Sequence, residues 1–498
     1  MAHIQLINVS ETKSMDGKIW RFSYGFPIII RSLMETKHTF NVTDLHLHKM
    51  TFEDLFEFID NCDDFIFGIS AYSNSYVIVK EVVKKIRKKN PEAVIIVGGF
   101  LSGNDDVLMK CTEVDIVVTS AIGEKVLPEI LDALDANSSV EHISGLTYKD
   151  RKNGQIMRTS KRKIISRDEY CKTPRPAYEY FDKELKEMTH NINSMSSVPV
   201  KGFSVITQRG CPFSCTFCGD SFGNHYLRKE WKDVFEEFEF LIDRYGVQGL
   251  YSVDTNFFLN RKDVDDYCRT YRERGHTFDM VIPLRPTFGD DEMFRKLAKH
   301  GIKVITFGIE HGNQKMLNRM KKKYNLNKMK KVYKAAVDAG ICIYGNFIFG
   351  TPGENKDTIQ DSKELMLFLE KLIYEQKIKF KQEGKICTSG YTWSILLPSP
   401  PSELYNTAIK KGLIEDEEQY LIALCAEKLT KTRQGKVFDI ELSRVGGDVN
   451  MSEFVSKSDL IFNVEHSIMQ VKLQSLLFDD KKEIPRSELV EILNEFSV

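Results

Sequence analysis

Short apolar runs alternate with amphipathic segments in the first third of the chain. Four runs are apolar on both faces, as expected for strands of a parallel sheet that helices cover on each side: Ile4–Val9, Phe65–Ser70, Ala93–Gly99 and Asp115–Ser120. Between the second and third runs, Val79, Val83 and Ile86 recur at helical spacing, and this pattern stops before Pro91. The pattern predicts an α/β fold that begins with a doubly wound, Rossmann-like domain over residues 1–140.

A second series of strand and helix patterns begins at Phe203. The six expected strands are Phe203–Gln208, Gly249–Asp254, Phe278–Leu284, Val304–Glu310, Ile341–Gly350 and Tyr391–Leu397. Each is followed by an amphipathic helical pattern, so the repeated units predict a partial (βα)6 barrel over residues 201–412. Functional residues are expected at the C-terminal ends of the strands, where parallel barrels carry their chemistry.

Two stretches lack a regular pattern. Residues 141–200 are rich in Lys and Arg and then in Pro, which indicates a connector between the two domains. Residues 413–498 are expected to form a small, mostly helical C-terminal region. Its predicted helices are Leu421–Leu429 and Ser487–Phe496, with a turn at Arg444–Asp448.

Composition narrows the class of protein. Of the 498 residues, 42% are hydrophobic and 28% charged, as in globular proteins, and the formal net charge is −1. This balance provides no electrostatic case for nucleic acid or for an anionic membrane surface. The N-terminus lacks the regions of a signal peptide, and no apolar run reaches the roughly 18 residues of a membrane span. We therefore expect a cytoplasmic protein, in which tightly spaced cysteines indicate a metal or redox site.

Three cysteines follow the first barrel strand directly. Cys211, Cys215 and Cys218 lie on one predicted loop, and the next cysteine, Cys268, falls on a distant predicted helix. Three thiolates hold three corners of a cubane [4Fe–4S] cluster and leave one iron open, whereas a fully ligated cluster needs four. The alternative is a structural zinc site that uses His225 as its fourth ligand.

The spacing CxxxCxxC, with the aromatic Phe217 before the last cysteine, resembles the signature of the radical S-adenosylmethionine (SAM) superfamily. The resemblance implies that the SAM amino and carboxylate groups chelate the open iron. It also implies that an electron, supplied by a donor such as flavodoxin or ferredoxin, cleaves SAM to methionine and a 5′-deoxyadenosyl radical. The expected partner beyond the electron donor is a small-molecule substrate.

The resemblance extends over the barrel. Gly308–Gly312 is similar to the family's fourth-strand segment, although Ser usually stands where His311 stands, and Gly345–Glu354 is similar to the fifth. The SAM contacts that it implies are Phe217, Gly219, Asp254, Arg285, Glu310, Gly345, Ile348 and Gly350. Without the resemblance, the charged members would be strand-end ion pairs and the glycines would belong to a plain strand and turn.

The segments Gly68–Ser70, Val97–Gly99, Asp115–Val118 and Gly123-Glu124 follow one another along the first domain. In the order and approximate spacing of these segments, the domain resembles that of the radical SAM branch with an N-terminal cobalamin-binding domain. Small residues end its predicted strands, as a bulky cofactor tail would require. The implied cobalamin contacts are Ser70, Tyr72, Gly98, Gly99, Thr119, Ser120, Gly123 and Glu124. The loop Glu11–Gly17 lacks the DxHxxG motif that supplies a cobalt-ligating His, which leaves open the alternative that this domain is only a scaffold.

The resemblance implies hydrogen abstraction from an unactivated carbon, followed by methyl transfer from methylcobalamin. Two alternatives remain open. One keeps the radical without the methyl group and leads to oxidation, ring contraction, cyclisation or dehydration. The other is a non-catalytic iron–sulfur binding or sensing protein. No residue beyond the three cluster cysteines is predicted to be catalytic.

Overall fold

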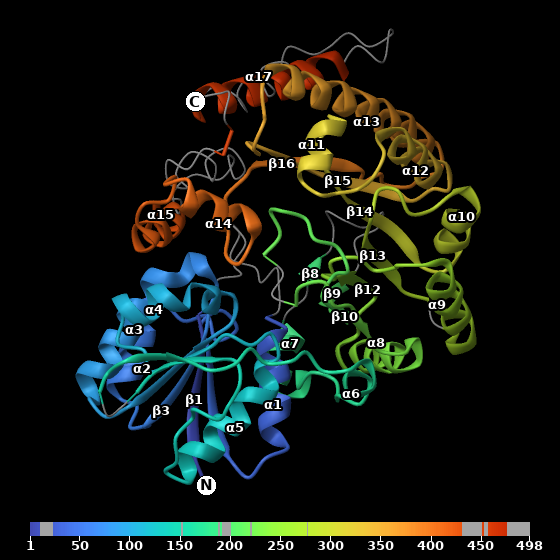
Figure 1. Ribbon diagram of the computed structural model, residues 1–498. Coiled ribbons are helices and arrows are strands. Elements are labelled where there is room, and N and C mark those ends of the chain that lie inside the picture. The colour runs from blue at the N-terminus through green and yellow to red at the C-terminus, as the bar shows by residue number, and fades with distance from the viewer. Residues whose placement is uncertain are drawn as a thin grey trace.

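The computed structural model describes residues 1–9, 23–150, 153–187, 190–191, 201–219, 222–275, 277–430, 451–452 and 457–475. The predicted features Glu11–Gly17, Arg444–Asp448 and Ser487–Phe496 lie outside this part of the chain. The described residues form two seven-stranded sheets, each covered by helices, with C-terminal helices that contact both halves (Figure 1).

The N-terminal sheet has the strand order β2-β1-β3-β4-β5-β6-β7. Its strands are β1 (His3–Asn8), β2 (Thr39–Asp44), β3 (Ile66–Ser70), β4 (Val94–Gly98), β5 (Ile116–Val118), β6 (Leu146–Lys149) and β7 (Ile156–Arg158). The first five are parallel, and β6 and β7 continue the sheet as antiparallel strands. The sheet thus extends beyond residue 140 into the predicted connector.

Helices cover both faces of this sheet. On one face, α1 (Gly25–Met34) and α5 (Gly123–Asp135) bury Ile30 and Ile130 against Ile4 and Ile96. The other face is covered by α2 (Phe52–Asp60), α3 (Tyr76–Lys89) and α4 (Asp105–Cys111). The sequence pattern predicted α3 and four of the strands but not β2, whose residues alternate between exposed and half-buried before ending in two buried positions.

The second sheet is a half-barrel with the strand order β16-β15-β14-β13-β12-β9-β8. Its parallel strands are β9 (Lys201–Val205), β12 (Gly249–Ser252), β13 (Asp279–Leu284), β14 (Ile302–Glu310), β15 (Cys342–Phe349) and β16 (Gly390–Ile395). The short β8 (His190–Asn191) pairs antiparallel with β9. The expectation of an α/β chain with a parallel half-barrel is confirmed at this level.

The crossover helices lie outside the half-barrel (Figure 1). They are α8 (Trp231–Tyr245), α9 (Arg261–Arg274), α10 (Asp291–Lys299), α12 (Leu326–Asp338) and α13 (Lys356–Gln382), with the short α11 (Gln314–Arg319) after β14. Asn260 and Asp290 cap α9 and α10 by accepting hydrogen bonds from backbone N–H groups of the first turn. These caps fix the points at which the strand-to-helix loops end. The loops themselves, at the C-terminal ends of the strands, are available to form the site.

Helices α14 (Glu403–Lys410), α15 (Glu417–Thr430) and α17 (Lys457–Ser475) follow the half-barrel. The predicted helix Leu421–Leu429 lies within α15. Helix α15 packs against α3, where Glu418 accepts a hydrogen bond from the Tyr76 hydroxyl (2.6 Å) and pairs with Lys80 (2.5 Å). Helix α17 packs along α13. The C-terminal region therefore contacts both sheets.

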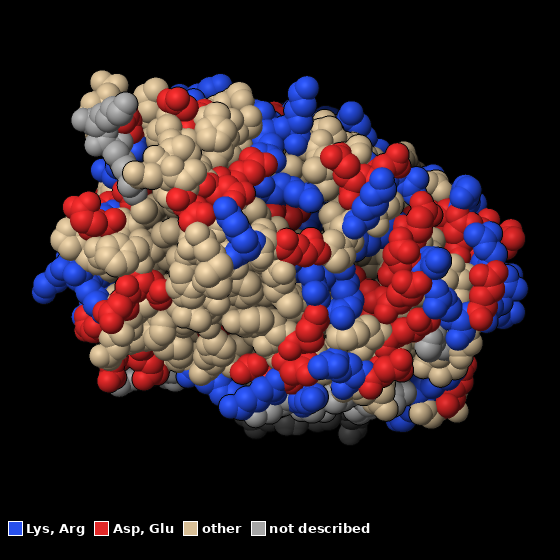
Figure 2. Space-filling view, turned by 90° about the horizontal axis from the view of Figure 1, so that it is seen from below, with Lys and Arg blue, Asp and Glu red and all other residues tan. Residues whose placement is uncertain are grey.

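Acidic and basic side chains are interspersed on the face shown in Figure 2, beside broad neutral areas. None of the described helices has the length and apolar character needed to cross a membrane.

Candidate active site

The cysteine loop lies between two short antiparallel strands, β10 (Gln208–Arg209) and β11 (Leu227–Arg228). The chain turns at Gly210, which has φ +75°. A Cβ atom at this position would lie 2.3 Å from the His225 carbonyl oxygen, so only glycine fits. The Thr255 hydroxyl donates to the Gly210 carbonyl oxygen (3.0 Å). The loop therefore leaves the sheet at a defined point directly before Cys211.

Cys211 and Cys215 are half-buried, whereas Cys218 is exposed. The Cys218 N–H donates to the Cys215 carbonyl oxygen (3.1 Å), which makes a tight turn between the last two thiols. Thr216 anchors the loop on both sides, because its N–H donates to the Met320 carbonyl oxygen (3.2 Å) and its carbonyl oxygen accepts from the Leu404 N–H (3.0 Å). The three thiols thus come from one anchored loop at the C-terminal end of the half-barrel.

The donor set fits an iron–sulfur cluster. In a cubane each thiolate binds a different iron, so the three sulfurs need not meet at one point. A zinc site gathers all its ligands within about 2.3 Å of one ion. Among the described residues, no three His, Cys, Asp or Glu side chains are grouped for a single ion, and His225 is exposed.

Two cations stand beside the cysteine loop. The Lys322 ammonium lies 2.6 Å from the Glu310 carboxylate and 5.4 Å from the centre of the Phe217 ring. The Arg285 guanidinium lies 3.6 Å from the centre of the Phe213 ring. Burial raises the pKa of the Cys215 thiol, and the positive charges of Lys322 and Arg285 oppose that rise. A cationic environment of this kind stabilises bound thiolates.

Glu310 ends β14 in an uncommon conformation. It has φ +65°, and the pairing of β14 with β15 shifts register between Gly308 and Glu310. A left-handed backbone at a bulky residue is strained, and such strain concentrates at functional sites. A Cβ at Gly308 would lie 2.5 Å from the Glu310 Oε1 atom, so Gly308 leaves room for the buried carboxylate. The bulge thereby turns Glu310 towards Lys322.

The next residue, His311, is fully buried and hydrogen-bonded at both ring nitrogens. Its Nδ1 accepts from the Asn313 N–H (2.9 Å), so the proton is on Nε2, which donates to Glu354 Oε1 (2.8 Å). Glu354 also accepts from the Thr358 hydroxyl (2.7 Å) and the Gly350 N–H (3.2 Å). We call His311, Glu354 and Thr358 the His311 network. It joins the end of β14 to the turn after β15.

The three predicted SAM positions of β15 have different surroundings. A Cβ at Gly345 would lie 2.2 Å from the Ile309 Cδ1 atom, so packing within the sheet already requires this glycine. Ile348 and Phe217, two of the predicted residues, pack against the same apolar cluster. Gly350 has φ +81°, and a Cβ there would lie 3.0 Å from Leu460 of α17. Helix α17 therefore contacts the turn after β15.

Asp254 is fully engaged in holding the start of the cysteine loop. It accepts hydrogen bonds from the Thr207 N–H (2.9 Å) and hydroxyl (2.6 Å), the Gln208 N–H (3.2 Å) and the Ser252 hydroxyl (2.8 Å). Burial raises its pKa. At the other end of the loop, a Cβ at Gly219 would lie 3.1 Å from the Pro400 carbonyl oxygen. Contacts of Asp254, Gly219 and Arg285 with SAM remain predictions.

The predicted cobalamin residues gather at the C-terminal edge of the N-terminal sheet. Ser70 is paired with Gly98 across β3 and β4, and Gly99 follows with φ +80°. The exposed ring of Tyr72 stacks on Phe100, with 5.1 Å between the ring centres. The other members are exposed Thr119, half-buried Ser120, and Gly123 with Glu124 at the start of α5. Their role in cobalamin binding remains a prediction.

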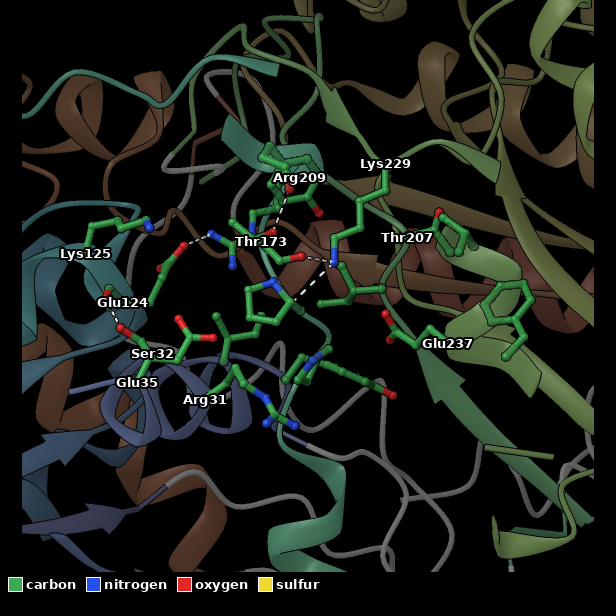
Figure 3. Close-up of a pocket in the computed structure, with 18 residues that line it drawn as sticks. Arg31, Ser32, Glu35, Glu124, Lys125, Thr173, Thr207, Arg209, Lys229 and Glu237 are labelled. Carbon is green, nitrogen blue, oxygen red and sulfur yellow. Dashed lines mark hydrogen bonds and ion pairs between the residues drawn. The ribbon is translucent and has the colours of Figure 1, made fainter. Parts of the chain in front are cut away.

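Glu124 and Arg209 link the N-terminal domain to the start of the cysteine loop. They form an ion pair of 2.5 Å between α5 and the residue that precedes the Gly210 turn. Both line a pocket at the junction of the two domains and the connector, which is shown in Figure 3. In the same pocket, Lys229 donates to the Thr173 carbonyl oxygen (2.7 Å) and Glu237 accepts from the Tyr178 hydroxyl (2.6 Å). The carboxylate predicted to meet cobalamin is therefore paired with the base of the cysteine loop.

Sequence reasoning missed Lys322, Arg209 and Glu354 as members of the site. Lys322 lies in the run Lys321-Lys322-Lys323, which has the appearance of a solvated surface segment. The only signal for Arg209 was its position next to the cysteine loop. Glu354 was noted only as the end of the β15 segment.

Comparisons with known proteins agree with this geometry. Residues 205–366 match the family described as the Radical SAM superfamily. An uncharacterized methyltransferase of Pyrococcus horikoshii is 25% identical over 390 residues, which cover 77% of this chain and 78% of that protein. Cytidylyl-2-hydroxyethylphosphonate methyltransferase of Streptomyces wedmorensis is 25% identical over 382 residues, 71% of this chain and 68% of that protein.

A solved structure shares the fold over almost the whole chain. It is the cobalamin-dependent S-adenosylmethionine radical enzyme OxsB with aqua-cobalamin and S-adenosylmethionine bound. The TM-score is 0.69 at 14% sequence identity, and the match covers 99% of this chain and 70% of that chain. The likeness extends the fold assignment beyond the matched family segment to the N-terminal sheet.

Proposed function

We propose, from the match of residues 205–366 to the Radical SAM superfamily, that the chain is a cobalamin-dependent radical SAM methyltransferase that acts on a carbon of a small molecule. The observation that carries the proposal is the placement of the cysteine loop. Its three thiols lie at the C-terminal end of a half-barrel, beside Glu310 and Lys322. The C-terminal ends of the strands in the N-terminal sheet face the junction between the two domains.

Each part of the site has a separate task in this proposal. Cys211, Cys215 and Cys218 would hold a [4Fe–4S] cluster, which together with SAM would supply the radical chemistry needed to remove a hydrogen atom from the substrate carbon. Glu310 offers an acceptor for the polar groups of SAM, and Lys322 orients that carboxylate by direct pairing. Arg285 holds Phe213 and adds positive charge next to the thiolates.

The exposed Cys218 marks the side of the loop that is open to an electron donor such as flavodoxin or ferredoxin. Electron transfer does not require a covalent contact, so an exposed thiolate ligand suffices as the nearest point of approach. Two similar curated proteins are named methyltransferases, which supports methyl transfer. The Tyr72 and Gly98-Gly99 edge is the proposed cobalamin surface.

The test uses the full chain, reconstituted anaerobically with iron, sulfide and hydroxocobalamin and reduced with dithionite. SAM that carries a labelled methyl group is then supplied with candidate small molecules, and products are read by mass spectrometry. We expect 5′-deoxyadenosine to form and the label to appear in one product. Chain that retains no cobalamin after desalting would contradict the methyl-transfer proposal. Deuterium transfer into 5′-deoxyadenosine without a methylated product would favour the alternative radical reactions.

A matched pair of cysteine variants controls this test. Cys218→Ser removes one cluster ligand, so iron content and SAM cleavage should both be lost. Cys171→Ser changes a half-buried thiol outside the cysteine loop, which donates a weak hydrogen bond to the Arg228 carbonyl oxygen (3.6 Å). This variant should retain wild-type iron content and SAM cleavage. If the two variants had the same iron content and the same SAM cleavage, the assignment of the cluster ligands would be excluded.

A further inference from the structure

Two thiols meet at the end of the half-barrel that faces away from the cysteine loop. Cys342 is the first residue of β15, and Cys387 lies shortly before the start of β16. Both belong to a small apolar cluster with Val281, Val304 and Phe380. Because the strands are parallel, their N-terminal ends lie at the opposite edge of the sheet from the active-site loops. Neither thiol can therefore take part in the chemistry proposed above.

The two side chains pack in this one cluster and are held by neighbouring groups. The Cys342 sulfur accepts a hydrogen bond (3.4 Å) from the N–H of Thr388, the residue next to Cys387. The Cys387 thiol donates to the Gln376 Oε1 atom (3.4 Å). Gln376 is itself fixed, because its Nε2 donates to the Ile341 carbonyl oxygen (2.9 Å). Residues from α13, β15 and the segment before β16 thus keep the thiols together.

This environment differs from that of a cysteine that only fills space. Cys268 is fully buried in α9, and burial raises its pKa to about 11. At Cys342 the neighbouring Cys387 and the Thr388 N–H lower the pKa of the thiol, and burial opposes them. The pKa of Cys387 is raised by the neighbouring Cys342 and by burial. Of the pair, Cys342 is the better thiolate.

We propose that Cys342 and Cys387 form a reversible disulfide, an oxidation site separate from the cysteine loop. The oxidant is a low-molecular-weight disulfide such as glutathione disulfide. Cys342 is 1% exposed and is out of its reach. Cys387 is half-buried and follows Ile386, which is 55% exposed. Oxidation therefore begins at Cys387.

The reaction balances without any group from the active site. The Cys387 sulfur, which gives up its proton, attacks one sulfur of glutathione disulfide, so that a mixed disulfide forms and one glutathione thiolate leaves. The Cys342 thiolate then attacks the Cys387 sulfur, which forms the internal disulfide and releases the second glutathione. Both glutathione thiolates take up a proton. Two protein thiols are oxidised and one glutathione disulfide is reduced to two glutathione molecules.

The disulfide would link the start of β15 to the segment that leads into β16, the last two strands of the half-barrel. It would restrict the unfolded chain across α13 and so stabilise the folded state. Because the link is remote from the cysteine loop, SAM cleavage should not change. The expected result is a rise in melting temperature of roughly 5 °C on oxidation.

The test treats the anaerobically reconstituted full chain with glutathione redox buffers of increasing disulfide content. Free thiols are alkylated after an acid quench, and a non-reducing digest is analysed by mass spectrometry. We expect a peptide pair cross-linked through Cys342 and Cys387 that disappears after treatment with dithiothreitol. Cys268 should remain free throughout. Recovery of both alkylated cysteines at every glutathione ratio would overturn the proposal.

Single variants test the order of the two steps and guard against a chance cross-link. In Cys342→Ser the second step is blocked, so the glutathione adduct of Cys387 should accumulate. In Cys387→Ser no thiol is accessible, so Cys342 should stay reduced. A glutathione adduct that accumulates on Cys342 in the Cys387→Ser variant would overturn the proposal. The absence of a glutathione adduct on Cys387 in the Cys342→Ser variant would also overturn it. The glutathione-dependent rise in melting temperature should be absent from both variants, and its persistence in either would likewise overturn the proposal.

Discussion

The Lys322 ammonium and the Glu310 carboxylate form an ion pair of 2.6 Å in which the side chains are only 12% and 7% exposed. The pair joins the strained end of β14 to the short segment between α11 and α12. Burial alone would lower the pKa of Lys322, but the Glu310 and Cys215 charges raise it, so the ammonium stays protonated. Lys322 thus brings a positive charge to the Glu310 side chain next to the cysteine loop.

Removing the cation from this pair should be costly. Lys322→Met leaves the Glu310 charge buried without its partner, which we expect to destabilise the chain by about 3–5 kcal/mol. The neighbouring Lys321 has a half-exposed side chain paired with Glu403, so Lys321→Met should cost at most about 1 kcal/mol. Urea unfolding of both variants checks the difference. Equal stabilities would show that the buried pair contributes nothing specific.

Two substitutions at His311 separate its hydrogen bonds. His311→Gln can still donate to Glu354 at the distance of the Nε2 atom, whereas His311→Asn is too short and keeps only the acceptor for the Asn313 N–H. Loss of one donor to a buried carboxylate should make the Asn variant about 1–3 kcal/mol less stable than wild type. The Gln variant should lose less.

The same two variants report on SAM binding. If the His311 network positions the ends of β14 and β15, the KM for SAM should rise in His311→Asn by about tenfold, equivalent to about 1.4 kcal/mol, and less in His311→Gln. Iron content serves as the control and should be unchanged in both. Wild-type KM values in both variants would mean that the His311 network contributes to folding but not to SAM binding.

A substitution at Gly345 distinguishes between two roles of this glycine, packing within the sheet and contact with the cofactor. Gly345→Ala places a methyl group 2.2 Å from the Ile309 Cδ1 atom, so we expect overpacking to cost about 1–3 kcal/mol even without SAM. Ile309→Val removes the clashing atom, so the double variant should recover much of this loss. Thermal unfolding of the apoprotein measures both effects. A variant that is as stable as wild type but binds SAM poorly would point to a cofactor role instead.

Glu237 should make stability depend on pH. Burial raises its pKa above the ordinary 4.5, while the Tyr178 hydroxyl lowers it by a smaller effect. The folded state therefore binds the proton more tightly than the unfolded state. Its contribution to stability is complete below pH 4.5 and is lost as pH rises through the folded-state pKa.

The matching variant isolates this contribution. Glu237→Gln keeps an acceptor for Tyr178 but cannot ionise, so its stability relative to wild type should increase from pH 4.5 to pH 7. Glu236→Gln, on the same helix with a side chain that is 53% exposed, should show no such trend. Urea unfolding across this pH range provides the measurement. A constant difference between Glu237→Gln and wild type would mean that the pKa of Glu237 is not raised in the folded state.

Much of the fold and the cluster site followed from local patterns. The apolar runs predicted four strands of the N-terminal sheet and the six parallel strands of the second, because buried parallel strands are apolar on both faces. The sequence pattern did not predict the edge strand β2, because its exposed and half-buried residues resemble an irregular segment. The cysteine spacing was informative because all three predicted ligands come from one loop, so no long-range contact was needed to bring them together.

The tertiary structure decided which distant residues meet. Sequence spacing cannot place Lys322 beside Glu310, Glu354 beside His311 or Cys387 beside Cys342, because each contact depends on how strands and loops pack in space. The same holds for Gly345, whose need for glycine comes from Ile309 on the neighbouring strand, and for Glu124, whose carboxylate pairs with Arg209 across the domain junction. Local chemistry was thus determined by the order of residues, whereas partners and burial were determined by the fold.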